Sequence, residues 1–282
     1  MSGIYLTWLA DVLRANGLSV VETNGWKTRA RSSGGFPSTP LGVQWHHTAS
    51  QTSPENDIHW QTVGCPDAPV GNMTIMRDGS VWLVAAGAAN TAGKGGPLTL
   101  SRGTIPLDSA NTRTVAIEAA NSGVGEPWPQ AQIDAYFATS NAINKQLGNL
   151  PSDVFTHALG AGDGWTDRKI DPATANAVQG PWRPNSVSGS GTWSLADIRA
   201  ECNRRAGTIV PPLPPIGDNE MVWVIKGGSS DSYYAWNGVS IAGIPGINWV
   251  TAGVTLGLYQ NADPIVYSQG EIDELIETQG ER

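Results

Sequence analysis

Short segments in which apolar and polar residues alternate are the main pattern in the first 210 positions, and they predict β-strands. Two of the segments are separated by the turn Arg77-Asp78-Gly79, which predicts a β-hairpin. The predicted strands are residues 42–47, 73–76, 80–85, 114–119 and 154–157.

Three other segments repeat apolar residues at the helical period and predict amphipathic helices. The first ends at Gly17 and repeats Ile4, Trp8, Leu9, Val12 and Leu13. The second covers residues 130–147 and ends at Gly148, and the third covers residues 194–206, with Ser194 as its capping residue. Strands and helices interleaved in this way predict an α/β domain in which helices pack on one sheet.

Charge and proline content divide the chain into two parts. Residues 218–282 hold nine of the 25 acidic residues but two of the 17 basic ones. The seam is a proline-rich segment, which predicts a stiff linker over residues 211–217. We therefore expect a catalytic domain over residues 1–210 and a small C-terminal module over residues 218–282.

The C-terminal module is acidic and rich in aromatic residues, with four of the six tyrosines and three tryptophans. Its alternating segments predict a mainly β unit, and residues 271–277 predict a short terminal helix. We interpret it as a module that binds carbohydrate through aromatic side chains. A structural or oligomerisation role is the alternative.

Composition excludes several classes of protein. The net charge of −8 argues against a nucleic-acid-binding protein, which needs a basic surface. No apolar run reaches the roughly 20 residues of a membrane span, so no membrane insertion is expected. The two cysteines, Cys65 and Cys202, do not make a disulfide framework, and their redox state stays open. The N-terminus reads as a helix of the fold and not as a signal peptide, so we expect synthesis in the cytoplasm.

Imidazole chemistry must use one of four histidines. His46 and His157 each end an apolar strand, and Asp171 follows His157 by 14 residues. Two imidazoles and one carboxylate suit a catalytic zinc ion, because three protein ligands leave a fourth position for water. Alternation places His47 on the face opposite to His46, so we interpret it as a packing histidine. His59 is interpreted as a loop or helix residue.

Four motifs in order resemble the zinc-dependent N-acetylmuramoyl-L-alanine amidases of the amidase-2 and peptidoglycan-recognition-protein family. They are Gln-Trp-His-His-Thr-Ala at 44–49, Met-Arg-Asp-Gly-Ser-Val at 76–81, Asn-Thr-Arg-Thr-Val-Ala-Ile-Glu at 111–118 and Arg-Lys-Ile-Asp-Pro at 168–172. The resemblance covers about residues 36–206 and implies a central mixed β-sheet flanked by helices. With the linker and the C-terminal module, the architecture is similar to a phage endolysin.

The resemblance implies a role for individual residues. His46, His157 and Asp171 match the family's zinc ligands. The segment between His157 and Asp171 is longer than the common family pattern by about four residues, which leaves Asp163 and Asp167 as rival ligands. Glu118 matches the catalytic carboxylate, and Lys169 matches a lysine that stabilises the oxyanion beside zinc.

The resemblance also implies the reaction and the substrate. The bond cut is the amide between N-acetylmuramic acid and L-alanine of the stem peptide, and the partner is bacterial peptidoglycan. Trp128 and Trp165 lie in polar, Gly- and Pro-rich stretches, so we expect them, with His47, to bind substrate at the rim of the cleft. An endolysin without a signal peptide implies release through a holin-type pore and lysis of the host cell.

The alternatives are a non-catalytic peptidoglycan-binding protein and a virion-associated protein on the same fold. Host range, the chemistry of the stem peptide and the oligomeric state have no signal in the sequence.

Overall fold

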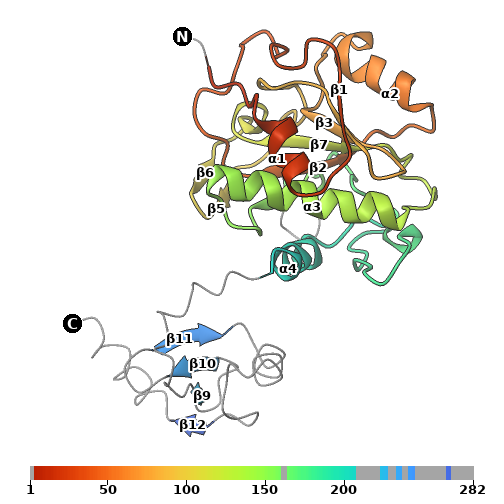
Figure 1. The fold of residues 1–282 in the computed structure, drawn as a ribbon. Helices are drawn as coiled ribbons and strands as arrows, with labels where there is room; N and C mark the ends of the chain where they lie inside the picture. Colours follow the sequence, from red (N-terminus) through yellow and green to blue (C-terminus); the bar gives the residue numbers. More distant parts are fainter. Residues whose placement is uncertain are drawn as a thin grey trace. The chain divides into compact units, whose positions relative to one another are not determined.

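The computed structural model describes residues 3–159, 164–207 and four strands in the C-terminal part. The chain divides into two compact units, Met1–Thr208 and Ile209–Arg282. The first unit, coloured from red to teal in Figure 1, contains all the positions discussed as site candidates.

A six-stranded mixed sheet forms the centre of the first unit. Its spatial order is β1-β4-β3-β7-β2-β8, in which β2 lies between β7 and β8. The strands β3, β7, β2 and β8 run parallel to one another, and β4 is antiparallel to β3 but parallel to β1. The bounds are β1 Val20–Glu22, β2 Val43–His47, β3 Met73–Ile75, β4 Val81–Leu83, β7 Val115–Ala119 and β8 Val154–Thr156. This confirms the predicted fold class.

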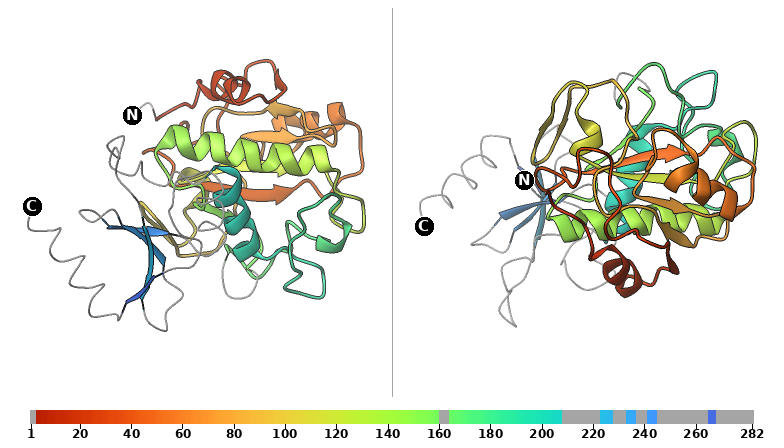
Figure 2. Two further views of the ribbon diagram at one scale, coloured as in Figure 1. Left: turned by 60° about the horizontal axis from the view of Figure 1, so that its bottom comes forward. Right: turned by 90° about the horizontal axis from the view of Figure 1, so that it is seen from above.

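The long helix α3 (Gln130–Leu147) packs against the central strands (Figure 2). Trp45 of β2 stacks on Tyr136 of α3 with ring centroids 3.8 Å apart. Because side chains alternate along a strand, His46 faces away from α3. The helix ends at Gly148, whose φ of +72° places it in the left-handed conformation that glycine adopts without strain.

Three other helices surround this centre. They are α1 (Leu9–Ala15), α2 (Pro54–His59) and α4 (Leu195–Arg205). Ser194 caps α4 as predicted, since its side chain accepts a hydrogen bond from the Asp197 N–H at 3.2 Å. Helix α1 begins at Leu9 and not at Ile4, because Ile4 exchanges backbone hydrogen bonds with Phe36. A small hairpin of β5 (Leu98–Leu100) and β6 (Gly103–Ile105) completes the unit.

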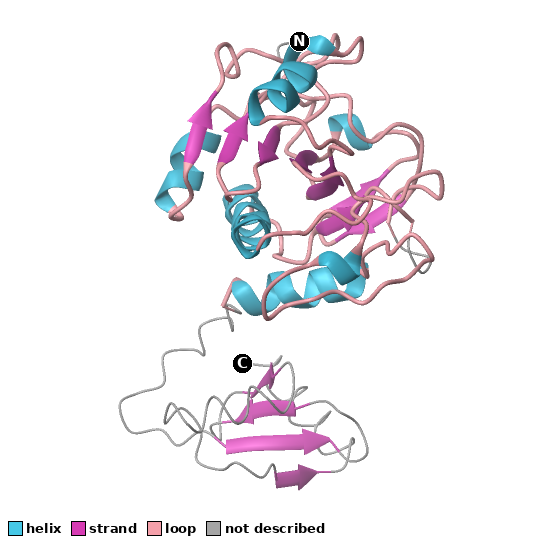
Figure 3. Ribbon diagram, turned by 90° about the vertical axis from the view of Figure 1, so that its right-hand side faces the viewer, coloured by secondary structure: helices cyan, strands magenta, loops and turns pink. Residues whose placement is uncertain are grey.

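The second unit contains a four-stranded sheet of order β11-β10-β9-β12 (Figure 3). Its strands are β9 Trp223–Gly227, β10 Tyr233–Trp236, β11 Ile241–Ile244 and β12 Ile265–Tyr267. This agrees with the mainly β character expected for the module. The predicted linker over 211–217 and the predicted helix over 271–277 lie outside the described residues. Among the residues that were described, no helix has the length and apolar character needed to cross a membrane.

Candidate metal centre

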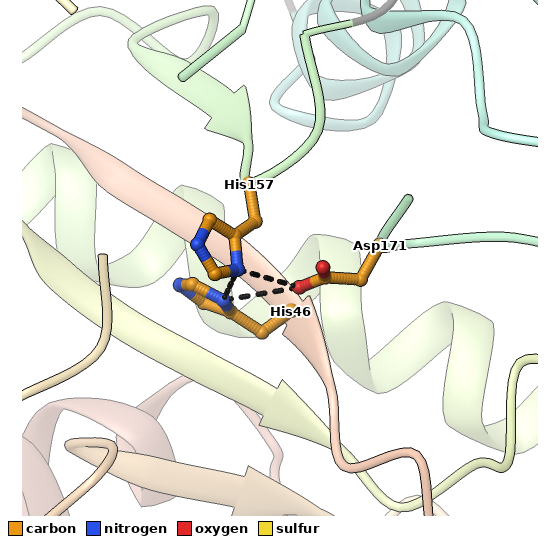
Figure 4. Close-up of side chains that lie close together, drawn as sticks. All are labelled: His46, His157 and Asp171. Carbon is orange, nitrogen blue, oxygen red and sulfur yellow. Dashed lines mark hydrogen bonds and ion pairs between the residues drawn. The ribbon is translucent and has the colours of Figure 1, made fainter. Parts of the chain in front are cut away.

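Three side chains from distant parts of the chain meet at one end of the sheet (Figure 4). The Nδ1 atoms of His46 and His157 are 3.0 Å apart. The Oδ2 atom of Asp171 lies 3.2 Å from Nδ1 of His46 and 3.0 Å from Nδ1 of His157. All three residues are buried.

Strand order explains how the two histidines meet. Trp45 of β2 is paired in register with Thr156 of β8, so the residues that follow them, His46 and His157, emerge side by side. The carboxyl ends of neighbouring parallel strands lie at the same edge of a sheet. Asp171 is brought there by the backbone, because the N–H of Ala158 donates to the Asp171 carbonyl at 2.9 Å.

The electrostatic state of the group favours cation binding. Burial and the neighbouring His157 lower the pKa of His46 to about 4, so His46 is neutral at pH 7. Nε2 of His157 lies 3.2 Å from the Ala92 carbonyl oxygen, which accepts and so assigns the proton to Nε2. Burial raises the pKa of Asp171, but the two imidazoles beside it outweigh this effect and hold that pKa well below its usual range.

A metal ion fits this donor set. With the proton on Nε2, Nδ1 of His157 presents a lone pair to the Asp171 carboxylate at 3.0 Å, an arrangement that a cation stabilises. Tetrahedral zinc with bonds of about 2.0–2.1 Å separates its ligand atoms by roughly 3.3 Å. The observed separations of 3.0–3.2 Å are close to that value. Within the described part of the chain, this is the one group of three or more His, Cys, Asp or Glu side chains with such spacing.

Glu118 lies beside this group on β7. It is paired in register with His46 of β2, and its Oε1 is 4.0 Å from Nδ1 of His46. Burial and the charge of Asp171 raise the pKa of Glu118 well above its ordinary value. A carboxyl group with a raised pKa is suited to exchange protons near neutral pH.

The remaining candidates lie in different surroundings. Lys169 is exposed, and its charge lowers the pKa of Glu118 and of His46. Asp167 is exposed and is not part of the three-residue group, whereas Asp163 lies outside the described residues. His47 is also outside that group: it is buried on the Trp45 side of β2, where its Nδ1 accepts from the Ala173 N–H at 3.4 Å.

The expectation that Trp128 and Trp165 form the rim of the cleft is wrong. Trp128 is 0% and Trp165 is 2% exposed. The indole N–H of Trp128 donates to the Ala173 carbonyl at 3.1 Å, and that of Trp165 donates to the Ala92 carbonyl at 2.8 Å. Because these polar, Gly-rich stretches fold back over the core, their tryptophans satisfy both packing and hydrogen bonding there.

A cavity of about 600 Å³ opens beside Glu118. Its walls come from the end of β2 with the following loop, from α2 and from the π-helical turn Trp60–Gly64. Trp60 is 56% exposed and lines this cavity, so the aromatic residue at the cleft is Trp60. Gln61 and Asp57 also line it. Sequence analysis missed these three residues because no motif or periodicity marks them.

Helix α3 contacts the backbone beneath His46 and Glu118 from the opposite face of the sheet. The Tyr136 hydroxyl accepts from the His46 N–H at 2.8 Å and donates to the His46 carbonyl at 2.7 Å. It is also 3.1 Å from the carbonyl of Ile117, which precedes Glu118. The Tyr136 hydroxyl therefore links β2 and β7 at the positions of His46 and Glu118.

Comparison with known proteins finds a family model that matches part of the first unit. Residues 37–174 match the family model described as N-acetylmuramoyl-L-alanine amidase. Similar solved structures include the endolysin amidase LysCS from Clostridium intestinale URNW, with 17% identity over 66% of this chain and 95% of that chain, at a TM-score of 0.36. AmpD, as its selenomethionine derivative, has 18% identity over 70% of this chain and 97% of that chain, at a TM-score of 0.42.

AmiD from E. coli was solved with the substrate anhydro-N-acetylmuramic acid-L-Ala-D-gamma-Glu-L-Lys. It has 20% identity over 54% of this chain and 60% of that chain, at a TM-score of 0.38. Comparison with curated protein sequences gives no match.

Proposed function

We propose, from the premise that residues 37–174 form a domain of the N-acetylmuramoyl-L-alanine amidase family, that the protein cleaves the amide between the lactyl group of N-acetylmuramic acid and L-alanine. The observation that supports this most is the buried group of His46, His157 and Asp171 with Glu118 4.0 Å from His46. This group provides metal ligands and an acid–base residue at one end of the sheet.

Zinc is the metal that we propose for this group. The ligands are Nδ1 of His46, Nδ1 of His157 and a carboxylate oxygen of Asp171. Bound there, zinc would act as a Lewis acid that lowers the pKa of water to about 7 and polarises the amide carbonyl. The low pKa of His46 keeps its imidazole available as a ligand at neutral pH.

Glu118 is proposed as the residue that moves the proton. Its carboxylate takes a proton from the attacking water and passes it to the nitrogen of the leaving alanine. The raised pKa of Glu118 suits the second transfer, because the protonated form is then stable enough to serve as an acid. We assign Lys169 to the oxyanion of the tetrahedral intermediate, since its charge already acts on Glu118 and His46.

The biological role that we propose is that of a phage endolysin. In this role residues 1–210 hydrolyse the bacterial cell wall and residues 218–282 bind it, after a holin-type pore gives access from the cytoplasm. Zinc dependence, host lysis and antimicrobial activity belong to this proposal. Binding of purified cell walls by the full chain and by a chain ending at residue 210 tests the role of the C-terminal module, and equal binding would contradict it.

The reaction is tested with purified peptidoglycan and mass spectrometry. We expect free stem peptides with an N-terminal L-alanine, loss of their release after dialysis against a chelator and recovery on addition of zinc. Release that is unchanged in the metal-free protein would refute the zinc mechanism. Cell-wall binding without any release of peptides would instead favour the non-catalytic binding protein.

A further inference from the structure

Gln61 is a buried residue with unusual surroundings. It is the second residue of the π-helical turn Trp60–Gly64, and 2% of it is exposed. Neither its Nε2 nor its Oε1 has a hydrogen-bond partner among the described residues. Buried amide groups are nearly always hydrogen-bonded, and π-helical turns occur frequently at functional sites.

The position of Gln61 places it next to the proposed acid. Gln61 and Glu118 line the same cavity. Both also flank Gly71: a Cβ atom placed on Gly71 would lie 3.0 Å from Oε1 of Gln61 and 3.2 Å from Cγ of Glu118. A side chain at position 71 would therefore press on both residues. Glu118 itself has a buried Oε2 that lacks a partner among the described residues.

The chemistry of a carboxamide narrows what Gln61 can bind. It offers hydrogen-bond donors at Nε2 and an acceptor at Oε1. Glu118 does not pair with this amide, since Nε2 and Oε1 of Gln61 both lack a hydrogen-bond partner among the described residues. The carbonyl of a secondary amide can accept a hydrogen bond from Nε2 of Gln61; in the trans form its N–H points the opposite way, so one amide does not also reach Oε1.

We propose that Gln61 is a substrate-binding residue that pairs with a secondary amide of the muramyl peptide adjoining the scissile bond. The inference rests on the proposed function. Two groups of the substrate carry this chemistry: the acetamido group of the muramic acid ring and the amide that joins L-alanine to the next residue. Both groups are close to the amide between the lactyl group and L-alanine, which is the bond that Glu118 is proposed to help cleave.

The experiment measures KM and kcat of the zinc-loaded full chain on a soluble N-acetylmuramoyl tripeptide. Gln61→Met keeps an unbranched side chain of similar length but removes both polar groups. We expect KM to rise about 10-fold, with kcat and zinc content nearly unchanged, because a hydrogen bond to substrate is lost. Gln61→Glu, which keeps the acceptor and loses the donors, should also raise KM and serves if the Met variant does not fold.

Gln44→Met is the matched control. Gln44 is also buried with both amide atoms lacking a partner among the described residues, but it does not line the cavity. We expect its KM to equal that of the wild type. The same rise in KM for both variants would overturn the inference, because the effect would then come from the loss of any buried amide.

Two altered substrates identify the amide. One lacks the acetyl group of the muramic acid, and the other is N-acetylmuramoyl-L-alanine methyl ester, in which an ester replaces the second amide. The difference in KM between wild type and Gln61→Met should disappear for the substrate that lacks the paired amide.

The failures are distinguishable. An unchanged KM of Gln61→Met on the complete substrate, a fall in kcat alone, or a difference that persists on both altered substrates would overturn the role of Gln61. A wild-type protein that hydrolyses none of these substrates would overturn the proposed function instead.

Discussion

Replacing Glu118 with glutamine should abolish activity and at the same time stabilise the metal-free fold. The variant is nearly isosteric, so packing is retained. Loss of a general acid–base residue lowers kcat by about 10²- to 10⁴-fold. Zinc content should not change, because the ligand group consists of His46, His157 and Asp171.

The stability effect follows from the surroundings of the carboxyl group. Burial and the charge of Asp171 raise the pKa of Glu118 in the folded chain, whereas a glutamate in an unfolded chain has a pKa of about 4.3. Above pH 4.3 the unfolded chain therefore releases a proton that the folded chain retains, and wild-type stability falls as the pH rises. Glutamine does not titrate, so the variant gains relative stability above that pH and nothing below it.

The size of the gain can be bounded. Oε2 of Glu118 is buried and lacks a partner among the described residues, which disfavours the ionised form in the folded chain. The gain therefore grows by at most about 1.4 kcal/mol for each pH unit above the unfolded-chain pKa of about 4.3. A gain of 1 kcal/mol raises the Tm by about 2–4 °C for a domain of 150–250 residues. The assay is thermal unfolding of the metal-free protein between pH 4 and pH 8, since a bound cation would favour the ionised carboxylate and hide the effect.

Glu201→Gln is the control with the opposite sign. Glu201 is also buried, but its carboxylate accepts hydrogen bonds from Arg204 and Arg205 at 2.6 Å, and these outweigh burial and lower its pKa. Its contribution to stability is present at neutral pH and is lost as the pH falls, so this variant should lower the Tm at pH 7. A lower Tm at pH 8 for Glu118→Gln, or a gain that does not depend on pH, would refute the reasoning.

Four further variants test the assignments around the site. Asp171→Ala should weaken zinc binding by more than about 100-fold. Asp167→Ala should retain zinc, because Asp167 is exposed and lies outside the ligand group. Equal zinc contents of the two variants after dialysis would contradict the ligand assignment. Trp60→Ala should raise KM by about 2- to 12-fold, the equivalent of about 0.5–1.5 kcal/mol of aromatic stacking, without lowering the Tm, because the side chain is 56% exposed. Trp165→Ala should instead lower the free energy of unfolding by about 3–5 kcal/mol, measured by denaturant unfolding, because the side chain is buried. A stable variant with an altered KM would show that Trp165 contacts substrate after all.

Local pattern predicted much of the fold because the governing physics is local. The alternation in residues 42–47 and 114–119 and the helical period in 130–147 required only neighbours in the sequence, and the structure has β2, β7 and α3 at these places. Local pattern could not predict the spatial order of the strands. It depends on long-range pairing, such as that between β2 and β8, which no single segment encodes.

The tryptophans show where local pattern fails. Trp128 and Trp165 have polar, Gly- and Pro-rich neighbours in the sequence, which favours exposure, yet the folded loops bury both. Trp60 follows His59, which is interpreted as a loop or helix residue, and no motif surrounds it in the sequence, yet it lines the cavity. Exposure of a large side chain depends on which distant segment covers it, and the sequence near the residue does not contain that information.

The position of β2 between β7 and β8 brings candidate ligands together from distant places in the sequence. His46 has Glu118 on one side and His157 on the other because β7 and β8 flank β2 in register, whatever the length of the connections. The same reasoning applies to the long segment before Asp171. The Thr166 N–H donates to the His157 carbonyl at 3.0 Å, and the Ala158 N–H donates to the Asp171 carbonyl at 2.9 Å. These bonds fix Asp171 from both sides of the loop, so additional loop residues need not move the carboxylate. A shift of β2 by one residue, in contrast, would turn the His46 side chain to the α3 face of the sheet and turn Trp45 out of the core.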